Sequence, residues 1–272
     1  MDSVLLVDFA NAAWRANMSW GKKEETQDEV MIYNFFRNLR PLVEMFSPQK
    51  IFFVLEGHPK HRYALYSEYK ANRIVKTAAK QEVHDKFYHN QNEILRLSKY
   101  LPITFCRAEN YECDDVIATL ADNMSQEEIN IISNDSDYIQ LLQRGYKNCK
   151  IYNPIKKTFM QSPKYHYITF KSLKGDPTDN IPGIVAESKA EKLASNPSLL
   201  SDWIILEENR SLFSINKQLI EFAKVPEEEL EIEDGARDFK SLKNEFEKLD
   251  FKSLIKDVTW QKFCHTFDCV TL

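Results

Sequence analysis

The stretch Ile129-Asn-Ile-Ile-Ser-Asn-Asp-Ser-Asp137 places two carboxylates, Asp135 and Asp137, directly after a short apolar run. The run has the length and the branched residues of a buried β-strand, so the two acidic residues follow the point where the strand ends. The same form occurs twice more: Asp8 follows residues 4–7, and Glu56 follows residues 51–55. The N-terminal half therefore combines buried strands with acidic residues at their ends.

The segments between these strands have apolar residues at helical spacing. Helices are predicted over 28–46, 82–100 and 112–124, and further short strands are predicted from Phe105 and over 150–152. Strands that alternate with helices of this length favour a doubly wound, mostly parallel α/β sheet with helices on both faces. From about residue 166 onward no strong strand signal is present, and helical pieces are broken by prolines. We therefore expect an α/β domain over 1–165 and a smaller helical region over 166–272.

The composition is that of an ordinary globular protein. The 272 residues are 43% hydrophobic, and 36 Lys and Arg against 41 Asp and Glu give a net charge of −5. No apolar run is long enough to cross a bilayer, and the N-terminus lacks the basic region of a signal peptide. Five cysteines without a C-x-x-C pair argue against a disulfide framework or a zinc site, and nucleotide-binding glycine motifs are absent. We expect a soluble protein that stays in the cytoplasm and has no membrane partner.

The charges are strongly segregated along the chain. Residues 57–80 carry six basic residues and one acid, and residues 145–174 carry seven lysines and no acid. Residues 226–250 reverse the balance, with ten acids against four bases. Any one basic run can be a solvated face, but two of them beside acidic motifs favour a polyanionic ligand such as nucleic acid.

Two further motifs add carboxylates outside the strand ends. Glu112, Asp114 and Asp115 lie at the start of the predicted helix 112–124, while Asp176 and Asp179 lie on a turn. Taken singly, acids at helix starts are commonly capping residues, and acids on turns commonly stabilise the turn. As a set they are expected to meet the strand-end acids, because ligand sites of open α/β sheets lie at the carboxyl ends of the strands.

So many carboxylates at one edge would repel one another and raise their pKa values. Divalent cations would neutralise such a cluster, and an all-oxygen ligand set selects Mg²⁺ or Mn²⁺. Two such ions about 4 Å apart can stabilise both the attacking and the leaving oxygen of a phosphodiester displacement. The sequence therefore predicts a metal-dependent phosphoryl-transfer hydrolase.

The motifs, in this order, resemble those of the 5′-nuclease (flap endonuclease) family. They are Leu6-Val7-Asp8, Leu55-Glu56-Gly57 with Tyr69-Lys70-Ala71-Asn72-Arg73, Glu112-Cys113-Asp114-Asp115, Ser133-Asn134-Asp135-Ser136-Asp137 and Gly175-Asp176-Pro177-Thr178-Asp179-Asn180. Within that family the chain is most similar to the ribonuclease H-type 5′→3′ exonucleases of T-even bacteriophages. The resemblance implies a PIN-like fold, a catalytic domain over 1–165, a DNA-binding helical domain over 166–272, and, for a phage protein, the host cytoplasm.

The same resemblance implies the reaction and the metal ligands. The expected activity is 5′→3′ exonuclease and flap endonuclease cleavage of DNA or RNA–DNA at free 5′ ends or flaps, as in primer removal during replication. Two Mg²⁺ ions, replaceable by Mn²⁺, are the expected cofactors. The implied ligands of the first ion are Asp8, Glu56, Glu112 and Asp114, and those that hold or orient the second are Asp115, Asp135, Asp137, Asp176 and Asp179. Glu56 departs from the family pattern, which has Asp at that position.

The resemblance also implies a basic arch over about 60–95 that receives the 5′ end. Lys70 and Arg73 are expected to contact the scissile phosphate, and Lys70, Arg73, Lys76 and Lys80 share one face if 70–80 is helical. Tyr63, Tyr66 and Tyr69 either pack or stack on bases. Further nucleic-acid contacts are expected from Arg62, Tyr69, Lys76, Lys80, Lys189 and Lys192, the last two because the segment after Gly183 lacks the glycines of the family's duplex-gripping hairpin.

Two other functions compete with this interpretation. A PIN-type endoribonuclease shares the acidic sheet edge, but it normally lacks the G-D-x-x-D-N loop. An inactive DNA-binding scaffold has no reason to keep a repulsive acidic cluster. A single-stranded-DNA-binding protein or a sliding clamp is a possible partner, although residues 261–267 match a clamp-binding peptide poorly.

Overall fold

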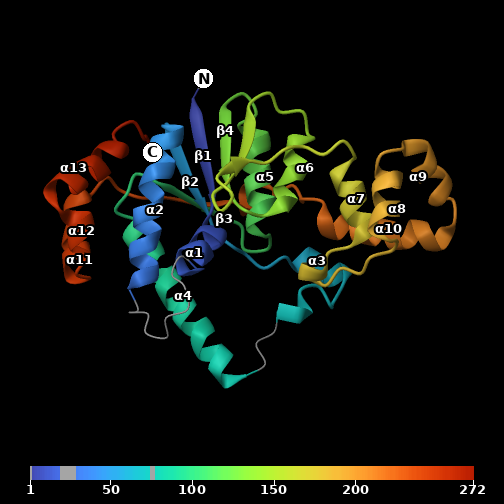
Figure 1. The fold of residues 1–272 in the computed structure, drawn as a ribbon, viewed down its shortest axis with the longest axis horizontal. Helices are drawn as coiled ribbons and strands as arrows, with labels where there is room; N and C mark the ends of the chain where they lie inside the picture. The colour runs from blue at the N-terminus through green and yellow to red at the C-terminus, as the bar shows by residue number, and fades with distance from the viewer. Residues whose placement is uncertain (1, 19–28, 74–76) are drawn as a thin grey trace.

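A seven-stranded sheet forms the centre of the computed structural model, which describes residues 2–18, 29–73 and 77–272 (Figure 1). The strand order is β6-β5-β4-β1-β2-β3-β7. Strands β5, β4, β1, β2 and β3 are parallel neighbours, and β6 and β7 add antiparallel edges. The bounds are β1 Ser3–Asp8, β2 Lys50–Val54, β3 Thr104–Arg107, β4 Glu128–Ile132, β5 Cys149–Asn153, β6 Thr158–Phe159 and β7 Glu231–Asp234. The predicted doubly wound, mostly parallel α/β fold is confirmed.

Helices cover both faces of this sheet. One face carries α1 (Phe9–Met18), α2 (Val30–Phe46), α4 (Ala78–Ser98), α11 (Phe239–Lys248), α12 (Lys252–Ile255) and α13 (Asp257–Thr266). The other face carries α5 (Cys113–Asn123) and α6 (Ile139–Leu142). In the part of the chain that the structure describes, no helix is long and apolar enough to cross a membrane.

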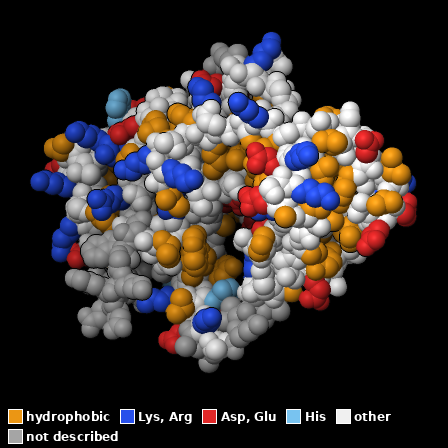
Figure 2. Space-filling view, turned by 45° about the vertical axis from the view of Figure 1, so that its right-hand side comes forward, with side chains coloured by type: hydrophobic (Ala, Val, Ile, Leu, Met, Phe, Trp, Pro, Cys, Tyr) orange, Lys and Arg blue, Asp and Glu red, His pale blue; other side chains and the backbone are white. Residues whose placement is uncertain are grey.

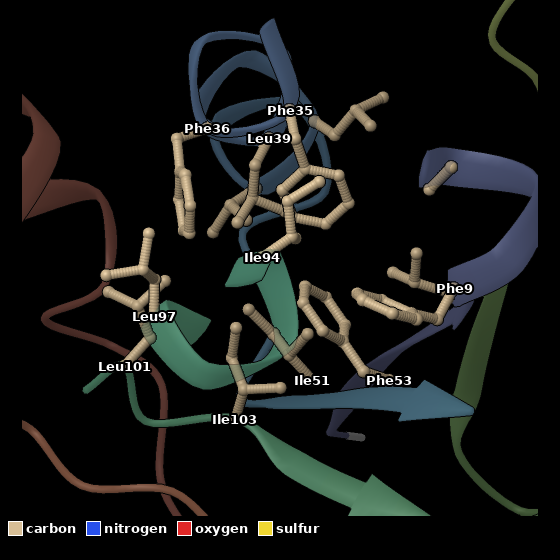
Figure 3. Packing of buried hydrophobic residues seen from close by; sticks show 14 of the residues in the cluster. Phe9, Phe35, Phe36, Leu39, Ile51, Phe53, Ile94, Leu97, Leu101 and Ile103 are labelled. Atoms are coloured by element: carbon tan, nitrogen blue, oxygen red, sulfur yellow. The ribbon is translucent and has the colours of Figure 1, made fainter. Parts of the chain in front are cut away.

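The core explains why the strand runs are apolar without alternation. In β1, Leu5 and Val7 pack into the cluster on one face, and Val4 and Leu6 pack into the cluster on the other. A parallel sheet covered on both sides buries every side chain of its central strands. Figure 3 shows the first cluster, in which aromatic side chains from α1, α2 and β2 fill the space above the sheet.

A second lobe lies beside the sheet. It contains α3 (Lys60–Leu65), α7 (Tyr167–Lys174), α8 (Glu187–Ala194), α9 (Pro197–Trp203) and α10 (Glu207–Ile220). Helices α7 to α9 surround a small apolar cluster of their own, and Figure 1 shows this lobe on the right. Residues of α3 and α10 in this lobe line one side of the pocket that contains predicted acidic residues.

The expectation that no strand follows residue 166 is wrong. Strand β7 (Glu231–Asp234) pairs with β3, and α11–α13 pack against α2 and α4 on the main core. All four residues of β7 are exposed and three are acidic, so the strand shows no apolar signal. Residues 231–272, which contain β7 and α11–α13, thus return to the α/β core, and the domain boundary near 165 stays a prediction.

Candidate active site

Three neighbouring strands bring acidic residues to one edge of the sheet. Asp8 ends β1, Glu56 follows β2, and Asp135 follows β4. The Asp8 carboxylate accepts hydrogen bonds from the Asn11 amide at 3.0 Å and the Ser133 hydroxyl at 3.1 Å. These bonds fix its orientation at the end of the strand.

Burial makes this edge electrostatically costly. Burial and then the charge of Asp135 raise the pKa of Asp8 to about 6, against the lowering effect of its hydrogen bonds. Burial, and next the charge of Glu112, raise the pKa of Glu56 to about 7. Both carboxylates are therefore held in surroundings that disfavour an uncompensated negative charge.

The start of α5 supplies the second group of carboxylates. Glu112 is its N-cap, and Glu112 and Asp115 form a reciprocal capping box. Oxygens of Glu112, Asp114 and Asp115 lie within 4.8 Å of one another. Burial, and after it the charges of Glu112 and Asp115, raise the pKa of Asp114 well above its usual value. Two residues of this cluster, Glu112 and Asp115, thus also cap the helix.

A tight loop brings the last two predicted acids to this place. Gly175 has φ +79°, and a Cβ on Gly183 would lie 2.3 Å from the Lys174 carbonyl oxygen, so the two glycines allow the loop to close. Asp176 accepts a hydrogen bond from the Thr178 amide at 2.8 Å. The loop thereby turns Asp179 toward the acids of α5.

These elements enclose one small pocket. Its polar lining consists of Arg62, Tyr69, Glu112, Asp114, Asp137, Asp176 and Asp179. The structure therefore brings together carboxylates from α5, from the segment after β4 and from the loop after α7. Figure 2 shows acidic side chains in the hollow between the core and the second lobe.

Two predicted catalytic cations lie among these acids. Lys70, which has φ +56°, forms ion pairs with Glu112 and Asp179, the latter at 3.7 Å. Arg73 forms an ion pair with Asp179. Burial alone would raise the pKa of Glu112, but Lys70 and then Arg62 hold that pKa below its usual value. Both cations therefore lie beside the acids, and their contact with the scissile phosphate stays a prediction.

Sequence reasoning missed Lys171, a third cation in the site. Its Nζ lies 2.9 Å from Asp137 Oδ1 and 2.5 Å from Asp176 Oδ2, and its side chain is mostly buried. Lys171 was visible only as one of seven lysines in the basic run 145–174. No local pattern in the sequence sets it apart from the other lysines of that run.

The prediction that Arg62 contacts nucleic acid is wrong. Arg62 is 1% exposed, and its guanidinium donates to both oxygens of Asp115, at 2.5 and 2.7 Å, and to the Leu219 carbonyl oxygen at 2.9 Å. Asp115 also accepts hydrogen bonds from the Glu112 and Ala223 amides. Although an oxygen of Asp115 lies near those of Glu112 and Asp114, its acceptor sites are occupied. Asp115 therefore orients the site rather than facing it.

Of the two alternatives for Tyr69, packing or stacking on bases, the structure favours packing, and the burial of its side chain contradicts the predicted contact with nucleic acid. Tyr69 is 2% exposed, and its hydroxyl donates to Glu112 at 2.9 Å and to Asp179 at 3.2 Å. Tyr63 and Tyr66 pack against the same small cluster. These tyrosines support the pocket instead of presenting faces to bases.

The condition for one basic face over 70–80, a helix through these residues, is not met by the described part of the segment. Lys70 has a left-handed backbone, residues 71–73 form one 3₁₀ turn, and α4 begins only at Ala78 after an extended Thr77. Lys76 lies outside the described residues. Lys80 is exposed on α4, and Lys189 and Lys192 are exposed on α8. These three remain predictions as nucleic-acid contacts.

The chemistry of the pocket fits a divalent metal ion. Apart from the basic and tyrosine side chains, its polar walls are carboxylates, and hard oxygen ligands of this type suit Mg²⁺ or Mn²⁺. The pKa of Asp137 is raised to about 6 by burial, although Lys171 lowers it. A divalent cation would relieve the cost of ionising such buried acids.

Comparisons with known proteins agree with this geometry. A family model described as "5'-3' exonuclease, N-terminal resolvase-like domain" matches residues 3–171. The chain is 28% identical over 259 residues to a 5′-3′ exonuclease of Aquifex aeolicus, and the match covers 84% of each protein. It is 28% identical over 213 residues to the thermostable DNA polymerase I of Thermus filiformis, but covers only 24% of that protein.

One solved structure is similar over nearly the whole chain. The D15 flap endonuclease of bacteriophage T5, solved with DNA and metal ions, superposes with a TM-score of 0.66 over 98% of each chain. The sequences are 15% identical, so this likeness establishes the fold. The second lobe and the C-terminal return to the core thus belong to a known arrangement.

Proposed function

The chain belongs to the 5′-3′ exonuclease family, a family of metal-dependent nucleases, and from this premise we propose that it hydrolyses phosphodiester bonds at the 5′ ends or flaps of DNA and RNA–DNA. The observation that carries the proposal is the acidic pocket, where Glu112, Asp114, Asp137, Asp176 and Asp179 meet. The function that follows from such a reaction in replication is the removal of primers.

We propose two Mg²⁺ ions as the cofactors, with Mn²⁺ able to replace them. Asp8, Glu56, Glu112 and Asp114 form the proposed site of one ion, and Asp135, Asp137, Asp176 and Asp179 that of the other. In the first group, Asp8 and Glu56 follow neighbouring strands and Glu112 and Asp114 lie at the start of α5. In the second group, Asp135 and Asp137 follow β4, and Asp176 and Asp179 lie on the loop after α7. When bound, such ions activate water and neutralise charge on the phosphate.

The protein's own residues then have distinct tasks. Lys70 and Arg73 carry positive charge to the rim of the pocket, where it would stabilise negative charge that grows on the phosphate in the transition state. Lys171 and Asp115 do not face the phosphate in this proposal. Lys171 holds Asp137 beside Asp176, and Asp115 holds the start of α5 through Arg62.

Three lysines are proposed to guide the substrate. Lys80 is exposed on α4, and Lys189 and Lys192 are exposed on α8. Their charges would follow the phosphate backbone of the strand or of the adjoining duplex. The proposed protein partner is a single-stranded-DNA-binding protein or a sliding clamp of a replication machinery.

The proposal is tested by digestion of 5′-labelled flap, nicked and RNA–DNA substrates with Mg²⁺, with Mn²⁺ and in excess EDTA. We expect products that shorten from the 5′ end, and no product in EDTA. A chain that cleaves equally well in EDTA, or one that cleaves internal sites of single-stranded RNA instead, would contradict it. The second outcome would favour a PIN-type endoribonuclease.

A further inference from the structure

Two glutamines that follow the acids after β4 bind the second lobe to the α/β core. Gln140 lies on α6, and Gln143 is the residue at which this short helix ends. In Figure 1, α6 lies between the sheet and α7, on the side of the core that faces the lobe. We call Gln140 and Gln143 the glutamine pair. Each of them uses both the oxygen and the nitrogen of its side-chain amide to bind backbone groups from across this boundary.

Gln143 binds the start of α7. Its Oε1 accepts a hydrogen bond from the Tyr167 amide at 2.8 Å, and its Nε2 donates to the Tyr165 carbonyl oxygen at 2.8 Å. From this helix the Tyr167 hydroxyl donates to Asp137 Oδ1 at 3.0 Å, and the loop that follows the helix carries Asp176. The position of α7 on the core therefore determines how Asp137 and Asp176 face each other.

Gln140 binds the other end of the lobe, where α10 returns to the core. Its side chain is buried, its Nε2 donates to the Ile220 carbonyl oxygen at 3.2 Å, and its Oε1 accepts from the Phe222 amide at 3.1 Å. Ile220 is the last residue of α10. Because a glutamine amide carries both a donor and an acceptor, it holds the backbone at two points and fixes the direction in which the chain leaves the helix.

A buried asparagine links α10 to the acidic loop. Asn216, on α10, donates its Nδ2 to the Ser172 carbonyl oxygen at 2.9 Å and to the Pro182 carbonyl oxygen at 2.8 Å. The first of these carbonyl groups lies before the loop and the second lies after it. The end of α10 thus holds both sides of the loop that carries Asp176 and Asp179.

We propose that the glutamine pair positions the two halves of the second metal site relative to each other. One half lies on the core after β4 and the other on the lobe after α7, namely Asp135 and Asp137, and Asp176 and Asp179. The inference rests on the proposed two-ion function and adds the residues that hold the second site together. The two glutamines are positioning residues, since their amides bind backbone groups and not the ion or the substrate.

The glutamine pair should affect the two proposed ions unequally. The ligands proposed for the first ion lie on the core, at the ends of β1 and β2 and at the start of α5. Those proposed for the second ion are divided between the core and the lobe. A small shift of the lobe against the core would therefore weaken binding of the second ion and leave the first in place. A general loss of stability would not separate the two ions in this way.

The test measures Mn²⁺ binding to the protein without substrate, from the electron paramagnetic resonance signal of free Mn²⁺. Wild type is expected to show two classes of site, and Asp176→Asn, which removes a lobe ligand, identifies the class of the second ion. Gln143→Met removes the amide but keeps the length of the side chain. It should weaken the second class by about 10-fold or more and leave the first within about 2-fold, on the scale of losing a group that orients a metal ligand.

A second variant and a matched control accompany this measurement. Gln140→Met should weaken the same class, and melting curves in EDTA show that each variant is folded. Gln218 is exposed on α10, and its Nε2 donates to Ser214 of the same helix. Gln218→Met is therefore the same change without a contact across the boundary, and it should leave both classes unaltered.

Two outcomes would overturn the inference. Equal weakening of both classes by Gln143→Met would mean that the glutamine pair supports the fold as a whole. Unchanged affinities in both glutamine variants would mean that the pair attaches the lobe without setting the metal site. Wild-type protein that binds fewer than two Mn²⁺ ions would instead contradict the two-ion proposal itself.

Discussion

Arg62 and Asp115 form a buried bidentate ion pair, in which the two terminal guanidinium nitrogens lie 2.5 and 2.7 Å from the two carboxylate oxygens. The same guanidinium reaches Glu112 at 2.9 Å and the carbonyl oxygen of Leu219 at 2.9 Å. The pair thus joins α3, the start of α5 and the end of α10 directly behind the acidic pocket. A residue first expected on the nucleic-acid surface is instead a support of the metal site.

Removal of one partner of this pair should destabilise the fold strongly. Arg62→Met leaves Asp115 buried without its cation, while Glu112 keeps its ion pair with Lys70, and a broken buried pair costs about 3–5 kcal/mol. The free energy of unfolding from urea titrations measures the loss. The double variant Arg62→Met/Asp115→Leu should recover part of it, because one uncompensated charge is gone. A single variant as stable as wild type would show that the pair does not hold these elements together.

Stability without metal should fall as the pH rises. The pKa values of Asp8 and Asp137 are raised to about 6 and that of Glu56 to about 7, so the folded state holds protons that the unfolded state has already lost. The unfolding free energy is then highest below about pH 4 for these groups and falls as the pH passes through 6 and 7. His61, whose pKa is lowered by burial, acts in the opposite direction but is one group against three.

Melting temperatures in EDTA and in Mg²⁺ test this expectation. In EDTA the melting temperature should fall between about pH 5 and about pH 8, and Mg²⁺ should raise it most at the higher pH, where the carboxylates are ionised. The same rise with Mg²⁺ at both pH values would argue against the raised pKa values. No rise at either would argue against a divalent metal site.

Local patterns explain how much of this site could be predicted from the sequence. Strand ends, helix starts and a glycine-bearing turn are set by neighbouring residues, so the strand-end acids Asp8 and Glu56 and the loop acids Asp176 and Asp179 could be recognised. That the strands lie side by side follows from the parallel sheet. The strands and helices predicted before residue 165, apart from a helix over 70–80, and the acidic edge therefore agree with the structure.

Contacts between distant parts of the chain explain what could not be predicted. The buried position of Arg62 depends on distant parts of the chain: Leu219, 157 residues away, accepts the hydrogen bond of its Nε. Strand β7 is exposed and mostly acidic, so its own residues do not indicate a strand. It forms a strand because it pairs with β3. Lys171 joins Asp137 and Asp176 across the lobe boundary, and no local pattern distinguishes it from other lysines.

Lys171 should set the acid limb of the activity profile. Its positive charge and hydrogen bond lower the pKa of Asp137, so Lys171→Met should raise that pKa further above 6. The acid limb of kcat/KM, measured below metal saturation, should move to higher pH, and activity should partly recover at alkaline pH. Lys171→Arg, which keeps the charge, should restore much of the profile. A uniform loss at every pH would indicate a structural role only.

Asp135→Asn should separate chemistry from binding. Asp135 Oδ1 accepts a hydrogen bond from the Asp137 amide at 2.9 Å, which an asparagine oxygen can also accept, so the local turn should survive. Loss of a proposed metal ligand should abolish cleavage, while loss of one negative charge should not weaken attraction to phosphate. Single-turnover rates and binding in EDTA give the two readouts. A variant that retains more than about a tenth of the rate, a barrier change under about 1.4 kcal/mol, would contradict the assigned role.

The last prediction separates the cations within the pocket from those outside it. Lys70 and Arg73 contact Asp179 at the rim of the acidic pocket, whereas Lys80 lies exposed on α4. Charge held beside the phosphate should act mainly in the transition state, so Lys70→Ala and Arg73→Ala should slow single-turnover cleavage by about 10²-fold or more. Lys80→Ala should leave that rate nearly unchanged, but raise the dissociation constant and reduce its salt dependence by about one unit of slope. Lys86→Ala, a change of the same residue type about 120° around α4 from Lys80, is the matched control and should alter neither quantity. Equal, purely binding-type defects in the Lys70, Arg73 and Lys80 variants would mean that all three only attract the substrate, and the catalytic role of the first two would then be lost.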